Sequence, residues 1–317
     1  MQELEAGSVG DYGKPERIIT TVTSKVFIFG NRVLKVYKHE AFFFGDMRDP
    51  DSRKKFFFED FFWNNNAAPE VYRHLWGVKG LALVPPTQGE DFIIEMSRID
   101  DTQTLTKLAT AGQLSPSHVA QFIDALVDTL CVLTKERHEH LEHLFKKGLL
   151  QIMREDIESM HKWLYTAQPY VIKKEADDIA DLLRQGVEIE PYFSSSLTPV
   201  GAAIDNNSDN LLLLEGRASF IDIMPPMAIW RVVDEYATIA RTIVDIEVLS
   251  GTELGEEARA AYAKRARKVP KIAQLVHEIR GGCIQWSYRH NLNQHELAQK
   301  FKESVFKKTS ELKMVLN

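Results

Sequence analysis

Cysteine is scarce in this sequence: among 317 residues there are only two, Cys131 and Cys283. Two thiols cannot form a disulfide framework, and no Cys-x-x-Cys or Cys/His spacing indicates a zinc site. No apolar run approaches the ~18 residues that are needed to span a bilayer. Residues 1–13 are polar and acidic, which is not the composition of a signal peptide. These absences predict a cytoplasmic protein with no membrane segment.

A net positive charge is also missing. The chain holds 39 Lys and Arg against 45 Asp and Glu, a formal net charge of −6, which argues against general binding to nucleic acid. The charge is nevertheless uneven, because residues 255–317 contain 13 basic and 6 acidic side chains. This basic C-terminal stretch is either a solvated helical face that offsets the acidic remainder, or a surface for phosphate, nucleic acid or a protein partner.

Both common glycine-rich phosphate loops are absent, since the chain has neither a Walker A motif nor a Gly-x-Gly-x-x-Gly motif. What is present is an ordinary globular composition, with 44% hydrophobic and 26% charged residues. A chain of this length is expected to form about two domains or lobes. Any nucleotide site must therefore be built from other elements.

The first hundred residues predict a small β-rich module. Residues 18–38 contain two runs of β-branched and aromatic residues on either side of Gly30 and Asn31, which is typical of a β-hairpin. Residues 53–66 have no Pro or Gly and predict a helix that ends at three asparagines. Residues 92–96 predict another short strand.

From about residue 101 the pattern becomes mainly helical. Ser115 and Pro116 form a helix-start signal. Helices are predicted over residues 117–137, 151–185 with an interruption at Pro169, 232–249 and most of 258–313. Residues 211–222 predict a short hairpin. The sequence therefore predicts an α+β protein, with a small β-rich part followed by a large helical part.

A polar loop and the hairpin after it carry the candidate chemistry. Asp205 is followed by Asn210 five residues later, and Asp222 comes twelve residues after that. In phosphoryl transfer, Asp205 can orient or deprotonate an attacking hydroxyl, while Asn210 and Asp222 hold the Mg²⁺ ions that bridge the phosphates. The hairpin returns the chain, so two residues twelve apart can share one ion. The alternative is plain turn chemistry, because Asp and Asn favour loops.

Two charged residues of the first module complete this constellation. Lys35 lies in the middle of a predicted strand and can reach the α- and β-phosphates, and Glu59 on the following helix can pair with it. Asp60 competes for that role, but the helical spacing of Glu59 with Phe62 and Trp63 favours Glu59. The alternative for Lys35 is a solvent-facing position on an edge strand.

These motifs, in this order, resemble the aminoglycoside-phosphotransferase-like branch of the protein-kinase-like fold, and most closely its bacterial members. The segments that carry the resemblance are residues 33–38, 59–64, 68–72, 205–210 and 220–222. It extends over roughly residues 18–290. It implies a two-lobed fold with a β-rich N-lobe (residues 1–96), a helical C-lobe (residues 97–317) and ATP between them.

The resemblance also implies cofactors, roles and a reaction. The cofactors are ATP and Mg²⁺, and Asp205 is the catalytic base. Residues 94–97 form the hinge, where the Glu95 carbonyl and the Ser97 N–H bind the adenine edge. The loop that covers the nucleotide, residues 20–25, has no glycine but offers to the phosphates its backbone N–H groups and hydroxyls, among them those of Thr21, Thr23 and Ser24. The implied reaction is ATP-dependent phosphorylation of a hydroxyl on an unidentified small-molecule acceptor.

Four residues depart from the family pattern. Ala203 and Ile204 stand where relatives have His-Gly, Asn207 stands where many have His or Lys, and Thr238 replaces the second acidic residue of a later motif. A second hypothesis therefore remains open: a catalytically weak or inactive kinase-like protein that binds nucleotide or acts as a scaffold.

Eight phenylalanines of the first module bear on that alternative. A lobe of 100 residues can hardly bury so many rings, so they form either its core or an exposed patch for a protein partner. They are Phe42, Phe43, Phe44, Phe56, Phe57, Phe58, Phe61 and Phe62.

Overall fold

The computed structural model describes residues 2–7, 9–21, 23–42, 45–135, 147–167, 169–195, 200–201, 207–223 and 232–317. The chain divides into two compact units. Unit 1 consists of Met1–Asp100 together with Ile221–Pro225, and unit 2 consists of Asp101–Phe220 and Pro226–Asn317. A short segment that contains Asp222 therefore packs with the N-terminal unit, although about 120 residues separate the two in sequence.

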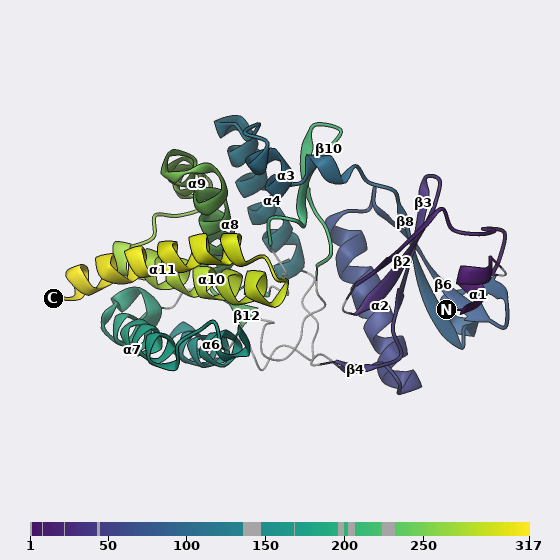
Figure 1. The fold of residues 1–317 in the computed structure, drawn as a ribbon, viewed down its shortest axis with the longest axis horizontal. Helices are drawn as coiled ribbons and strands as arrows, with labels where there is room; N and C mark the ends of the chain where they lie inside the picture. The colour runs from purple at the N-terminus through teal and green to yellow at the C-terminus, as the bar shows by residue number, and fades with distance from the viewer. Residues whose placement is uncertain are drawn as a thin grey trace. The chain divides into compact units, whose positions relative to one another are not determined.

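Unit 1 is built on a six-stranded sheet and one long helix (Figure 1). The strand order is β1-β2-β3-β8-β6-β7, and every pairing is antiparallel, so β3 and β8 lie in the middle. The bounds are α1 (Gln2–Ala6), β1 (Arg17–Thr20), β2 (Ser24–Phe29), β3 (Arg32–Tyr37), β4 (Ala41–Phe42), β5 (Gly45–Asp46), α2 (Pro50–Ala67), β6 (Tyr72–Lys79), β7 (Ala82–Val84), η1 (Pro86–Gln88) and β8 (Asp91–Ser97).

The predicted β2–β3 hairpin is confirmed. Phe29 lies opposite Arg32, and Gly30 and Asn31 form the turn between them. Gly30 has a φ of +57°, a conformation that glycine adopts without steric cost. Because β3 has neighbours on both sides, residues 33–37 are all buried. This burial includes Lys35, so the alternative of a solvent-facing lysine on an edge strand is wrong.

Helix α2 begins at Pro50, three residues before the predicted start at residue 53. The Asp49 side chain accepts a hydrogen bond from the Ser52 N–H, and Pro50 occupies the first helical position. The Phe57 ring is fully buried and packs against Tyr37 and Phe92 of the sheet. These contacts place one face of α2 against β3 and β8.

The phenylalanine cluster divides between the core and the surface of unit 1. Phe56 and Phe57 belong to the core. Four others are half-buried, and Phe43 and Phe44 lie outside the described residues. The half-buried rings are Phe42, Phe58, Phe61 and Phe62. Thus only part of the cluster forms the lobe core that the sequence suggested.

Unit 2 is mostly helical, with short two-stranded pairs (Figure 1). Its bounds are η2 (Asp101–Gln103), α3 (Leu105–Thr110), α4 (Pro116–Lys135), α6 (Leu149–Leu164), η4 (Tyr165–Ala167), α7 (Lys173–Ile189), η5 (Pro191–Ser194), β9 (Val200–Gly201), β10 (Leu211–Leu214), β11 (Arg217–Phe220), β12 (Val232–Val233), α8 (Glu235–Ser250), α9 (Thr252–Arg265), α10 (Lys271–Asn291) and α11 (His295–Leu316). The helix predicted over 232–249 starts later than expected, because Val232 and Val233 pair with β9 and Asp234 caps α8.

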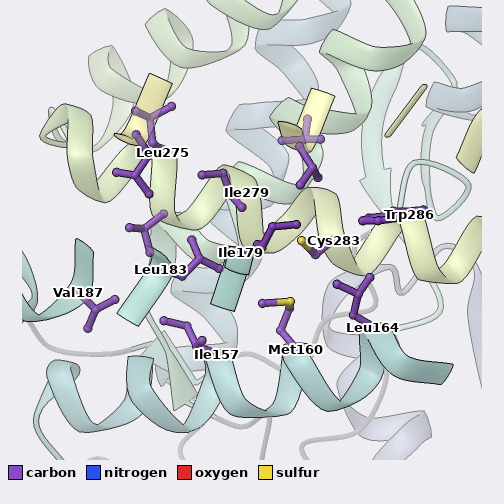
Figure 2. Packing of buried hydrophobic residues seen from close by; sticks show 14 of the residues in the cluster. Ile157, Met160, Leu164, Ile179, Leu183, Val187, Leu275, Ile279, Cys283 and Trp286 are labelled. Carbon is purple, nitrogen blue, oxygen red and sulfur yellow. The ribbon is translucent and has the colours of Figure 1, made fainter. Parts of the chain in front are cut away.

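A hydrophobic core of unit 2 lies among α6, α7, α10 and α11, and Figure 2 shows side chains that α6, α7 and α10 contribute to it. Each helix contributes aliphatic or aromatic side chains at helical spacing, including Ile157, Leu183 and Trp286. Gly186 allows close packing of α7 on α10, because a Cβ atom there would lie 2.9 Å from Val276 Cγ2. Cys283 is buried in this core, and burial raises the pKa of its thiol to about 12, which makes it unreactive.

Much of the basic C-terminal stretch is neutralised inside unit 2. The Glu278 carboxylate, 1% exposed, accepts from Lys308 Nζ at 2.8 Å and from Arg259 at 2.7 Å. Arg280 pairs with Asp156. Lys308 also pairs with Glu247 of α8 at 3.0 Å. These cations hold α6, α8, α9, α10 and α11 together, so the stretch is not simply a solvated face.

The predicted fold class, a β-rich N-terminal region followed by a mostly helical region, is confirmed. Across the part of the chain that the structure describes, every helix is too short or too polar to cross a bilayer.

Candidate functional site

Lys35 is the centre of a buried charge cluster in unit 1. It lies on β3 between β2 and β8, with its side chain 8% exposed. Its Nζ atom is 2.5 Å from Asp222 Oδ1 and 3.9 Å from Asp60 Oδ2. The structure therefore brings together Lys35 and Asp222, which the sequence analysis had placed in one site from two distant segments.

The predicted Lys35–Glu59 pair is wrong, because Asp60 takes this position. The Glu59 carboxylate is 20% exposed and lies 4.0 Å from Lys55 Nζ, one helical turn earlier. Asp60 is 1% exposed and shares the buried face of α2 with Phe57 and Trp63, three residues away on either side. The buried face is thus turned by one residue from the face that the sequence favoured.

The charges in this cluster shift one another. Burial raises the pKa of Asp60 to about 6, against the opposing effect of the Lys35 charge. Burial alone would lower the pKa of Lys35, but the carboxylates of Asp222 and Asp60 raise it well above its usual value. The Tyr37 hydroxyl donates to Asp60 Oδ2 at 3.0 Å. The cluster therefore contains a permanent cation and one carboxyl that titrates near neutral pH.

The stability of the protein should depend on the protonation of Asp60. The pKa of the Asp60 carboxyl is 3.8 in the unfolded chain and about 6 in the folded protein, so between these pH values only the folded protein keeps the proton. The stability that Asp60 contributes is therefore present below about pH 4 and is lost as the pH rises through about 6. We expect the free energy of unfolding of the wild type to fall, relative to Asp60→Asn, by on the order of 3 kcal/mol between pH 4 and pH 7. Denaturant unfolding at each pH measures this difference.

The exposed Asp51, in the first turn of the same helix, supplies the control. Asp51→Asn should run parallel to the wild type across this pH range. A wild-type curve parallel to that of Asp60→Asn would show that Asp60 does not titrate in this window.

Asn210 and Asp222 flank the hairpin that the sequence predicted. Asn210 directly precedes β10, and Asp222 follows β11 by two residues. Leu211 lies opposite Phe220, so the chain leaves the hairpin at the end where it entered. The side chain of Asp222 is 53% exposed, which leaves carboxylate surface open to solvent besides the oxygen on Lys35. A metal ion shared by these two residues stays a prediction.

The loop between β1 and β2 uses its hydroxyls within its own turn. Thr21 Oγ1 accepts from the Ser24 N–H at 2.9 Å and contacts Ser24 Oγ at 2.9 Å. Ser24 is 2% exposed, and the Thr23 N–H is directed at Thr21 Oγ1 at 3.3 Å. This network shapes the glycine-free loop. A contact between these hydroxyls and phosphate stays a prediction.

The adenine contact predicted for the Ser97 N–H is wrong. Strand β8 continues through Ser97, and that N–H donates to the Val71 carbonyl at 2.8 Å. Glu95 lies inside the sheet, paired with Leu34 and His74 in the neighbouring strands. The boundary between the two units falls later, after Asp100. The chain therefore passes from unit 1 to unit 2 beyond the end of β8.

The predicted base Asp205 and the departing residue Ala203 lie outside the described residues. Residues 207–210 of the same loop are described, and Asp245 of unit 2, which was not predicted from the sequence, anchors them. Asp245 on α8 is fully buried, and its Oδ2 accepts from the Ser208 N–H at 2.9 Å. Its other oxygen accepts from Gln285 at 2.5 Å. A lone aspartate within the apolar run 243–246 was the signal for this anchor.

Asn207 and Asp234 have local structural roles. The buried Asn207 side chain accepts from the Asp209 N–H at 2.9 Å and so shapes its own turn. Asp234 caps α8 and is paired with Arg267 at 2.5 Å and His277 at 3.0 Å. Asn207 is uncharged and Asp234 is acidic, so neither side chain can supply a positive charge to stabilise a transferring phosphoryl group.

No protein-family model and no curated protein matches the sequence. Solved structures do match along nearly the whole chain. An APH(2")-IIia complex with GDP and kanamycin has a TM-score of 0.57 at 10% identity, covering 98% of both chains. Choline kinase from Cryptosporidium parvum has a TM-score of 0.57 at 13% identity, covering 98% of this chain and 92% of its own. The fold is protein-kinase-like.

A third similar structure is a thermostable mutant of aminoglycoside phosphotransferase APH(4)-Ia, in a ternary complex with AMP-PNP and hygromycin B. Its TM-score is 0.54 at 13% identity, covering 97% of this chain and 99% of that chain. The resemblance inferred from the motifs is thus confirmed at the level of the protein-kinase-like fold. At these identities the likeness shows the fold alone.

Proposed function

We propose that this chain is a phosphotransferase that uses ATP and Mg²⁺ to phosphorylate a hydroxyl group of a small molecule. The observation that carries the proposal is the buried Lys35 of β3, held between Asp60 at 3.9 Å and Asp222 at 2.5 Å. A buried lysine needs such partners to remain charged. In kinase-like sites a lysine on this strand, paired with a helix carboxylate, binds the α- and β-phosphates.

In this proposal Asp60 replaces Glu59 as the helix partner of Lys35. Asp222 and Asn210 are the metal ligands, and Asp205 orients the acceptor hydroxyl and takes its proton. Asp245 holds the loop that carries Asn210, through the Ser208 N–H.

The residues of the proposed metal site suit Mg²⁺. Carboxylate and amide oxygens are its preferred protein ligands, and the half-exposed Asp222 carboxylate offers one. Among the described residues there is no cluster of three or more His, Cys, Asp or Glu that could hold a metal. A magnesium–nucleotide site does not require one, because phosphates and water supply the other ligands.

The names of the similar structures support a small-molecule acceptor. Two were solved with aminoglycosides, kanamycin and hygromycin B, and with GDP or AMP-PNP, while a third is a choline kinase. We therefore propose a compact hydroxyl-bearing metabolite or drug as acceptor. ATP and GTP are to be compared directly as phosphate donors.

Magnesium and ATP together should raise the melting temperature of the protein. A ligand that binds only the folded state, at about 100 times its Kd, stabilises by about 2.7 kcal/mol, which for a chain of this size corresponds to about 4 °C. Thermal melting with ATP and Mg²⁺ measures the shift, with ATP and EDTA as the control. No shift at millimolar nucleotide would count against a nucleotide site.

The reaction itself is tested by transfer of labelled γ-phosphate. The acceptor panel should include kanamycin, hygromycin B, choline and a range of metabolites with free hydroxyls. Magnesium-dependent labelling of any acceptor, lost in Asp205→Asn, is the expected result. Tight magnesium–nucleotide binding without transfer to any acceptor would favour the alternative below.

The alternative is a kinase-like nucleotide-binding or scaffold protein with weak or no catalysis. One observation favours it: the Asn207 side chain is 2% exposed and bonded to Asp209 within its own loop. It cannot supply the charge that many relatives place there. The two hypotheses share the nucleotide site and differ only in phosphate transfer.

A further inference from the structure

Asp222 has an unusual backbone conformation for a residue with a side chain. Its φ angle is +54°, in the left-handed region that residues other than glycine rarely occupy. Such a conformation persists only where the surrounding structure imposes it, and it is often found at functional sites. The contacts around Asp222 identify what imposes it.

Two buried side chains fix the peptide groups on both sides of Asp222. The Tyr72 hydroxyl accepts from the Asp222 N–H at 2.9 Å. Asn64 Oδ1 accepts from the Ile223 N–H at 2.7 Å, and its Nδ2 donates to the Ile223 carbonyl at 2.8 Å. The φ and ψ angles of Asp222 are the rotations between these two peptide groups. Fixing both groups therefore fixes the backbone of Asp222.

Asn64 also connects this turn to the rest of the charge cluster. Its Nδ2 donates to the Asp60 carbonyl at 2.9 Å and lies 3.0 Å from Asp60 Oδ1. The amide is thus oriented from both sides, with nitrogen toward Asp60 and oxygen toward the Ile223 N–H. Asn64 is 0% exposed and Tyr72 is 1% exposed, so water does not compete for these bonds.

The direction of the Asp222 carboxylate follows from this backbone. With φ and ψ fixed, Oδ1 reaches Lys35 Nζ at 2.5 Å while the side chain stays 53% exposed. We propose that Asn64 and Tyr72 are positioning residues that lock the left-handed turn at Asp222 and thereby aim its carboxylate at Lys35 and at the incoming metal ion. The metal part of this inference rests on the proposed function, whereas the Lys35 part does not.

The test compares Tyr72→Phe and Asn64→Leu with the wild type in the full chain. Loss of an outer-shell partner typically weakens metal binding about 10- to 100-fold. We expect the Mg²⁺ concentration for half-maximal AMP-PNP binding to rise about 10-fold in Tyr72→Phe and more in Asn64→Leu. Binding of AMP-PNP without Mg²⁺ should change less than 2-fold. Calorimetric titration measures both quantities.

Two control variants separate positioning from general destabilisation. Asn66→Leu replaces an exposed asparagine two residues along the same helix, whose Nδ2 bonds only the Phe62 carbonyl among the described contacts. Tyr236→Phe removes a buried hydroxyl in unit 2 that bonds Glu278. Neither control should move the Mg²⁺ midpoint, even if Tyr236→Phe lowers the melting temperature.

A second readout is independent of the proposed function. The coupling between Lys35 and Asp222 is measured by a double-mutant cycle of unfolding, with Lys35→Met and Asp222→Asn. The cycle is then repeated in the Tyr72→Phe and Asn64→Leu backgrounds, where we expect the coupling to shrink. If Asn64→Leu does not fold, Tyr72→Phe, which loses one hydroxyl, still decides the question.

Two outcomes overturn the inference. One is an unchanged Lys35–Asp222 coupling in both variant backgrounds. The other is an Mg²⁺ midpoint that stays at the wild-type value while the melting temperature falls, which is the signature of a merely structural role. A wild type without magnesium-dependent nucleotide binding would instead overturn the proposed function, and the coupling cycle alone would then decide the positioning role.

Discussion

Asp222→Ala is expected to lose magnesium-dependent nucleotide binding, by more than ~100-fold in affinity, because it removes the proposed metal carboxylate. Asp205→Asn should retain that binding and lower turnover about 10²- to 10⁴-fold, since it removes a group that acts on the acceptor hydroxyl. Titration of AMP-PNP with Mg²⁺ and the rate of phosphate transfer separate the two effects.

Two further variants serve as controls for this prediction. Asp222→Asn keeps the size of the side chain and removes only its charge, so it should also weaken magnesium binding. Asp51→Ala removes an exposed acidic residue from α2 and should behave as the wild type. Equal loss of nucleotide affinity in Asp205→Asn and Asp222→Ala would show that the two roles are wrongly assigned.

Lys35→Met is expected to lower both stability and nucleotide affinity. Without Lys35, the buried Asp60 has no cation within 4 Å among the ion pairs of the described residues. Removing one partner of a buried pair costs about 3–5 kcal/mol, less where the remaining carboxyl takes up a proton, and the pKa of Asp60 is already raised to about 6. Denaturant unfolding at pH 7 measures the loss.

A double variant separates the two consequences. Lys35→Met with Asp60→Asn removes both buried charges and should recover most of the stability, but it should not recover nucleotide binding, because the phosphate-binding cation is still missing. Lys79→Met changes an exposed lysine on β6 of the same sheet and serves as the control. Recovery of nucleotide binding in the double variant would contradict the phosphate role of Lys35.

Helix α2 shows that the hydrophobic pattern of a helix does not always predict which of its faces is buried. Aromatic residues occupy positions 56, 57, 58, 61, 62 and 63, which cover almost every direction around the helix. Periodicity then cannot select the buried face. The contacts of Phe57 with Tyr37 and Phe92 select it, and they place Asp60 rather than Glu59 beside Lys35.

The end of β8 shows a related limit of sequence-based prediction. The strands β6 and β7 were not predicted, because residues 72–84 mix polar, basic and aromatic residues without a clear alternation. In the structure β6 pairs with β8, and β8 continues through Ser97, whose N–H donates a hydrogen bond to the Val71 carbonyl. The pairing partner thus decided where β8 ends and where the chain leaves the sheet.

The sequence by itself determined the elements whose signals are local. The turn at Gly30 and Asn31 defines the β2–β3 hairpin, the apolar runs define the β10–β11 hairpin, and together they place Lys35 on a strand and Asp222 just after one. Their order along the chain was enough to indicate the protein-kinase-like fold. Hydrophobic pattern and turn chemistry act over a few residues, so they can be read without a structure.

Only the tertiary structure decided how the site is assembled. Lys35 meets Asp222 across 187 residues, Asn64 meets Ile223 across 159, and Tyr72 meets Asp222 across 150. Each of these contacts depends on which faces of the helix and strands are buried together, and on a left-handed turn at a residue with no glycine signal. Local propensity does not encode such contacts, because their partners become neighbours only when the chain packs.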